Sequence, residues 1–136
     1  MVYTAEIISQ SPHCIVMNVK DLEEYSAAWN AHDIDKIMQY MTDDCIFETG
    51  GGSERYGTRH VGFDNVRQRF IEVWTDIPDV RFENPLHFVQ GDNGCSEWTI
   101  IGTRPDGSTM ELDGCDLFTF ENGKIKSKRS YIKDRQ

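Results

Sequence analysis

The sequence has no long apolar segment, no excess of basic residues and no closely spaced cysteines. No apolar run approaches the roughly 20 residues that a membrane-spanning helix requires. With 14 Lys and Arg against 23 Asp and Glu, the formal charge of −9 repels the phosphate groups of nucleic acids. Cys14, Cys45, Cys95 and Cys115 lack the spacing of zinc or redox motifs. We therefore expect no membrane, nucleic-acid or metal partner, and interpret the cysteines as small structural residues.

The start of the sequence also lacks a basic segment followed by an apolar stretch. The residues Met1–Glu6 therefore give no sign of a secretory signal, and we expect a cytoplasmic location. At 136 residues, 38% hydrophobic and 27% charged, the chain has the size and composition of one globular domain. Residues 1–18 show no clear period and are predicted to form an N-terminal arm, and 19–136 a single domain.

Apolar residues at helical spacing predict three helices in the first half of the chain. Tyr25 and Trp29 lie one turn apart on the first of them, together with Leu22. In the second helix an apolar stripe continues as far as Met41, and Pro78 prevents the third from continuing. The first predicted helix begins at Asp21. The second runs from its capping residue Asp33 to a stop at 42–44, and the third covers 64–74.

Segments rich in β-branched and aromatic residues follow the helices and are separated by short turns. A short strand is predicted at 45–48, and four longer ones at 80–89, 95–103, 109–120 and 124–133. Strands joined by short turns pair as an antiparallel meander. The order of the elements therefore predicts an α+β domain, with the helices on one face of a largely antiparallel sheet.

One carboxylate stands out on the predicted inner face of this sheet. The Pro-Asp-Gly turn after 95–103 sets a register in which Ser96 lies opposite Asp116. The same face carries the apolar residues Trp98, Ile100 and Phe118. Asp116 is thus an acid in a row of large apolar side chains, and a buried carboxylate needs a partner.

The next hairpin offers two candidate partners. A two-residue turn at Asn122–Gly123 pairs Asp116 with Arg129, whereas a bulged three-residue turn pairs it with Lys128. A cation that stays near Asp116 favours the carboxylate, which can act as a base. A cation that extends away leaves a neutral acid. A purely structural ion pair is the alternative to both.

Four segments resemble the nuclear-transport-factor-2-like superfamily, and within it the ketosteroid-isomerase-like and SnoaL-type polyketide-cyclase group. They follow the pattern of that group in order, and the resemblance extends from about residue 19 to 133. It implies a cone of three helices closed by a curved, largely antiparallel sheet, with a deep apolar pocket and a homodimer. The segments are Tyr25–Asp33, Tyr40–Phe47, Gly62–Arg67 and Gly114–Ile125.

The resemblance also implies roles for individual residues. Tyr25 and Asp116 fall where ketosteroid isomerases place the two hydrogen-bond donors to a dienolate oxygen. The proton-shuttling aspartate of those enzymes falls on Thr49, which cannot act as a base near neutral pH, so the steroid-isomerase reaction itself is not expected. Glu48 is adjacent, but strand alternation directs it to the opposite face. His60 lies where related folds place the pocket mouth and is a candidate for proton transfer.

These expectations combine into one leading hypothesis and two alternatives. We expect a cofactor-free isomerase, lyase or cyclase that acts on a small hydrophobic carbonyl compound through an enolate-like intermediate. The alternatives are a non-catalytic small-molecule-binding module or dimeric scaffold, and a protein-binding domain. Candidate catalytic residues are Asp116, Tyr25, His60 and Lys128, and candidate substrate-binding residues are Trp29, Phe47, Thr49, Phe70, Trp98, Ile100 and Phe118.

Overall fold

The computed structural model describes residues 16–136 as three helices and a six-stranded sheet. The strand order is β2-β1-β6-β5-β4-β3, and neighbouring strands are antiparallel except for the parallel pair β1–β6. The helices are α2 (Val19–Asn30), α3 (Ile34–Gln39) and α4 (Phe63–Asp76). The strands are β1 (Met41–Glu48), β2 (Arg59–Val61), β3 (Arg81–Gln90), β4 (Asn93–Thr103), β5 (Thr109–Glu121) and β6 (Lys124–Ile132).

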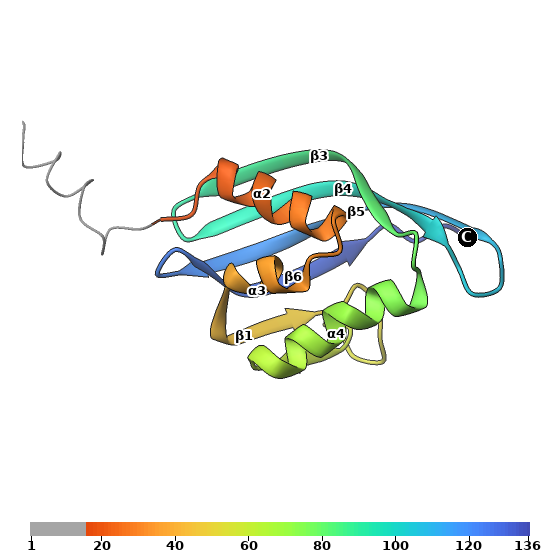
Figure 1. Cartoon of the computed structure of the whole chain (residues 1–136), viewed down its shortest axis with the longest axis horizontal. Helices are drawn as coiled ribbons and strands as arrows, with labels where there is room; N and C mark the ends of the chain where they lie inside the picture. The colour runs from red at the N-terminus through yellow and green to blue at the C-terminus, as the bar shows by residue number, and fades with distance from the viewer. Residues whose placement is uncertain (1–15) are drawn as a thin grey trace, which may run out of the picture.

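The helices cover one face of the curved sheet, with α2 near β3 and α4 near β1 at the opposite edge (Figure 1). The hydrophobic core lies between the two layers. Its wholly buried large side chains come from the three helices and from β1 and β6: Leu22, Ile37, Met41, Cys45, Val66, Phe70 and Ile125. The predicted α+β class, with three helices and a largely antiparallel curved sheet, is confirmed.

The first helix begins before the predicted residue. Asn18 caps α2 by accepting a hydrogen bond from the Asp21 backbone amide at 3.0 Å, and the Asp21 carboxylate accepts one from the Asn18 amide at 3.0 Å. This reciprocal capping box fixes the helix start at Val19, so the predicted start at Asp21 was wrong. Met17 packs into the core. Residues 1–15 of the predicted arm lie outside the described part of the chain.

The second helix is shorter than predicted. Asp33 caps it as expected, since its side chain accepts from the Lys36 amide at 3.1 Å. The helix ends at Gln39, however, and the predicted stop at 42–44 lies inside strand β1. Met41 is buried from that strand and not from the helix, because pairing of β1 with β6 places it against the core. Tertiary pairing thus overrides the local helical pattern.

The register of the strands on either side of Asp116 was predicted correctly for β4 but not for β6. Ser96 pairs with Asp116 across β4 and β5, as the Pro-Asp-Gly turn predicted. On the other side Asp116 lies opposite Ser130, so both predicted partners, Lys128 and Arg129, were wrong as directly opposite residues. The Asn122–Gly123 turn does have two residues, but a bulge then shifts the register of β5 against β6 by one residue.

That bulge coincides with a break in the neighbouring strand pair. The pairing of β1 with β6 also changes register between Met41 and Ile46, beside the inserted residue Lys126. Lys126 turns toward β1 and forms an ion pair with Asp44. The bulge therefore depends on contacts with a strand far away in the sequence, which the hairpin alone cannot reveal.

Across residues 16–136, none of the helices combines the length and the apolar character that crossing a membrane demands.

Candidate functional site

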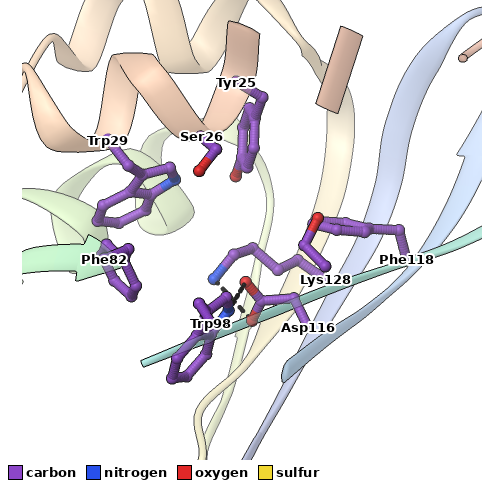
Figure 2. Close-up of a pocket in the computed structure, with 9 residues that line it drawn as sticks. Tyr25, Ser26, Trp29, Phe82, Trp98, Asp116, Phe118 and Lys128 are labelled. Carbon is purple, nitrogen blue, oxygen red and sulfur yellow. Dashed lines mark hydrogen bonds and ion pairs between the residues drawn. The ribbon is translucent and has the colours of Figure 1, made fainter. Parts of the chain in front are cut away.

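Asp116 is buried at the inner end of a cavity, with only 6% of its surface exposed. Each of its carboxylate oxygens has a partner. Trp98 Nε1 donates a hydrogen bond to Oδ2 at 3.0 Å, and the Ser130 hydroxyl donates to Oδ1 at 2.6 Å. The Nζ of Lys128 lies 3.3 Å from Oδ1 (Figure 2). The carboxylate is held in a fixed orientation by three side chains from the two neighbouring strands, β4 and β6.

Lys128 is buried as deeply as Asp116 and stays inside the cavity. Its Nζ lies 4.4 Å from the ring centroid of Phe47 and 5.3 Å from that of Trp29, so aromatic faces stabilise the ammonium along with Asp116. Burial lowers the pKa of Lys128, and the charge of Asp116 opposes that shift. Of the two situations expected from the sequence, the structure shows the one in which the cation remains beside the acid.

Tyr25 reaches the same inner cavity from α2 (Figure 2). Its hydroxyl donates to Met41 Sδ at 3.7 Å, and a thioether is a weak acceptor. Burial raises the pKa of Tyr25 above its usual range, and the charge of Asp116 acts in the same direction. Tyr25 therefore remains a neutral phenol, able to give its proton in a stronger hydrogen bond to a ligand.

A polar row crosses the inner face of four strands at the level of Asp116. His87 pairs with Ser96, Ser96 with Asp116, and Asp116 with Ser130. His87 Nδ1 and Ser96 Oγ are hydrogen-bonded at 2.7 Å. Sequence analysis paired Ser96 with Asp116 but missed His87 and Ser130. Ser130 lies beyond the register shift at Thr119 and Phe120, where a simple count along the hairpin fails, whereas His87 pairs with Ser96 in unshifted register from the β3–β4 turn.

The cavity consists of a narrow inner part of about 20 Å³ and an outer chamber of about 200 Å³. Trp29, Phe82, Trp98 and Lys128 line both parts, so the two hollows adjoin each other. Of the predicted substrate-binding residues, Phe118 lines the inner part, and Phe47, Thr49 and Ile100 line the outer chamber.

Phe70 occupies a different place from the other predicted pocket residues. It is wholly buried, with its ring centroid 4.8 Å from that of Trp29 and 5.1 Å from that of Phe47. Phe70 therefore lies behind the residues that line the cavity and supports them, and it does not form part of the wall.

Thr49 lines the outer chamber, but its hydroxyl is occupied by the adjacent loop. It donates to the Gly51 carbonyl at 2.7 Å and accepts from the Thr58 amide at 2.9 Å. Glu48 points to the other face of the sheet and pairs with Arg59 at 2.8 Å, so the prediction from strand alternation is confirmed. Neither residue places an acid in the cavity.

His60 is separated from Asp116 by Phe47. It lies opposite Phe47 in the β1–β2 pair and stacks on its ring at 6.2 Å, facing a second hollow beside α4. Burial lowers the pKa of His60. Its Nε2 is buried and has no hydrogen-bond partner within residues 16–136. The structure thus brings together Asp116, Lys128 and Tyr25 but leaves His60 outside this group.

Within the described range of the chain, no three His, Cys, Asp or Glu side chains are grouped so that they could hold a metal ion. Cys45, Cys95 and Cys115 are free thiols, of which Cys45 is buried. Cys14 lies outside the described residues.

The SnoaL-like domain family matches residues 22–128 of this chain. TerC, co-crystallised with polyporic acid, is 22% identical over 90% of this chain and 92% of that one, with a TM-score of 0.72. A Xanthomonas campestris protein of unknown function with a cystatin-like fold is 21% identical over 87% of this chain and 92% of its own, with a TM-score of 0.75.

A candidate polyketide cyclase from Pseudomonas putida is 21% identical, with coverage of 81% and 86% and a TM-score of 0.69. No curated protein matches the chain. At these identities the structural similarities establish the fold alone. Because the family match spans most of the described residues, the chain belongs to the SnoaL-like domain family.

Proposed function

We propose that this protein is a cofactor-free enzyme that isomerises, eliminates from or cyclises a small hydrophobic carbonyl compound through an enolate. The observation that carries this proposal is the buried pair of Asp116 and Lys128 at the inner end of an apolar cavity. The family match and the candidate polyketide cyclase among the structural relatives support it.

In the proposed reaction Asp116 removes a proton from the carbon next to the carbonyl group. The electrons of that C–H bond form a carbon–carbon double bond, and the carbonyl π electrons move to oxygen, giving an enolate. A carboxylate offers about four lone-pair sites, so Asp116 can accept this proton while it keeps its bonds to Trp98 and Ser130. The negative charge thus moves from Asp116 to the substrate oxygen.

Lys128 and Tyr25 stabilise the oxygen on which this charge develops. As Asp116 becomes neutral, the ammonium of Lys128 loses its counterion and can pair with the enolate instead, in surroundings that strengthen the interaction. Tyr25 replaces its weak bond to Met41 by a hydrogen bond to the same oxygen. Return of the proton to another carbon gives isomerisation. Attack of the enolate carbon on a second carbonyl gives cyclisation, and the new alkoxide takes the proton.

Exchange of α-protons in heavy water tests this proton-transfer step, and it does not require that the natural substrate be known. Tetralone and phenyl-substituted β-diketones are incubated with the protein, and loss of the α-proton signals is followed by NMR. We expect Asp116→Asn to lower the catalysed exchange rate by about 100-fold or more, and Tyr25→Phe by a comparable factor. Unchanged exchange in both variants would rule out the mechanism. Asp113→Asn, on the outer face of β5, is the matched control and should retain full exchange.

A non-catalytic binding module is the second candidate, and Thr49 favours it. The hydroxyl of Thr49 is bound to loop backbone atoms, so the outer chamber has no acid where related isomerases place their proton-shuttling aspartate. The same cavity would then hold a hydrophobic ligand unchanged. A compound that raises the melting temperature without exchanging its α-protons would favour this candidate.

We also propose a homodimer formed through the outer face of the sheet. Leu86, Phe88 and Tyr131 are directed away from the helices and are 50%, 56% and 50% exposed in the single chain. Cross-strand pairing places Leu86, Glu97, Cys115 and Tyr131 in one row on this face. Large apolar side chains gathered on one face are typical of a subunit contact. Light scattering at defined concentrations measures the oligomeric state.

A further inference from the structure

Arg69 on α4 is a half-buried cation that lines the outer chamber of the cavity. Within residues 16–136 it forms no ion pair and no side-chain hydrogen bond, although the protein as a whole carries an excess of acids. Its neighbour Arg67, two residues earlier, pairs with Asp35 at 3.5 Å. Arg69 therefore has donors free for a ligand, whereas Arg67 is already engaged.

The charged groups around Arg69 leave the chamber in need of an anion. Glu72 and Asp76 are on the same helix and are exposed, and neither lies within ion-pair distance of Arg69. Asp76 also lines the chamber, but its side chain is exposed, so water screens its charge. Deeper in the cavity Lys128 is matched by Asp116. The guanidinium of Arg69 is thus a cation of the chamber that no carboxylate among residues 16–136 pairs with.

A guanidinium presents its donors as a planar fork, which matches the two oxygens of a carboxylate or of an acidic enol. The remaining wall of the chamber is mainly apolar and aromatic, with Phe47, Phe82 and Trp98 among its residues. The complementary molecule therefore has an acidic group at one end and a hydrophobic, preferably aromatic, body.

We propose that the ligand of this cavity is an acidic aromatic compound whose carboxylate or acidic enol is bound by Arg69. Its hydrophobic body fills the outer chamber, and its reacting carbonyl group points inward to Asp116 and Lys128. This inference rests on the proposed function and specifies the substrate class. It also gives Arg69 a second role, because the two ends of the cavity bind different groups and so fix the direction in which the substrate enters.

Two matched probes test the role of Arg69: a naphthoate and the corresponding naphthylmethanol, which differ in charge but hardly in shape. Isothermal titration calorimetry measures the affinity of each for the wild type and for Arg69→Gln, Arg69→Lys and Arg67→Gln. Wild type should prefer the naphthoate. Arg69→Gln should weaken naphthoate binding about tenfold or more, the usual effect of losing a hydrogen bond to a charged group, and leave the alcohol unchanged.

The two other variants make the result specific. Arg69→Lys keeps the charge but loses the planar fork, so naphthoate affinity should lie between those of the wild type and Arg69→Gln. Arg67→Gln removes a charge of the same sign from the same helix and should change neither affinity. Equal affinities of the wild type for both probes, or an equal loss of both in Arg69→Gln, would overturn the role of Arg69 but leave the apolar cavity intact. Failure of both probes to bind at millimolar concentration would overturn the proposed ligand site as well.

Discussion

The ion pair of Lys128 and Asp116 gives the sharpest test of how this site is built. Both side chains are almost wholly buried, and Nζ lies 3.3 Å from Oδ1. Breaking such a pair by removing one partner costs about 3–5 kcal/mol, because the other charge stays buried without compensation. In Lys128→Met, Asp116 keeps its two hydrogen-bond donors, Trp98 and Ser130. We therefore expect a loss near the lower end of that range, about 3 kcal/mol.

The double variant Lys128→Met with Asp116→Asn removes both charges and keeps the shape of the site. Replacement of a buried ion pair by uncharged residues is often nearly neutral, so its stability should lie within about 1 kcal/mol of the wild type. Urea unfolding at fixed pH and protein concentration measures all four proteins, and the slope of each transition checks for two-state behaviour. Losses in the double variant that equal the sum of the two single losses would show no coupling and refute the assignment.

The pH dependence of stability supplies an independent check on Lys128. Burial lowers its pKa below the ordinary value of 10.5, so the unfolded chain binds more protons than the native protein between the lowered pKa and 10.5. Stability should therefore rise with pH through that window, because the native state no longer has to hold a buried ammonium there. The rise should be absent from Lys128→Met. A parallel rise in the wild type and the variant would assign it to another group.

Four further predictions concern residues around the site and on the outer face. Gly114→Ala should destabilise the protein by about 2 kcal/mol in urea unfolding, since a Cβ atom would lie 2.7 Å from the Trp98 ring. Burial raises the pKa of Tyr25 above 10.0, so as pH rises the unfolded chain loses the Tyr25 proton before the native protein does. Wild-type stability should therefore fall as pH rises past 10.0, and Tyr25→Phe should show less of this fall. His60→Phe should stabilise the protein by about 1 kcal/mol, because it removes a buried nitrogen that has no hydrogen-bond partner among residues 16–136. The same variant should lessen the loss of stability below pH 6.5. Phe88→Glu should shift the population toward monomer in light scattering, without changing the ligand affinity of the cavity.

Part of the candidate site could be predicted because it depends on short-range geometry. The Pro-Asp-Gly turn is a local signal, and from it the alternation of β4 and β5 places Ser96, Trp98 and Asp116 on the inner face. Tyr25 and Trp29 follow from the helical period of α2 in the same way. Lys128 was one of the two cations expected beside Asp116, and it does pair with it. The residue directly opposite, Ser130, could not be predicted, since the bulge at Lys126 involves β1 as well.

By itself the sequence determined the α+β class, the order of the elements and the apolar faces, because periodicity, caps and turns act over a few residues. Only the tertiary structure decided that Met41 lies in a strand and that Ser130 faces Asp116 with Lys128 beside them. It also decided that Arg69 lines the chamber with no ion-pair partner among residues 16–136. Each of these outcomes depends on elements distant in the chain. A register shift of one residue changes which side chains meet, and only the packed sheet fixes that shift.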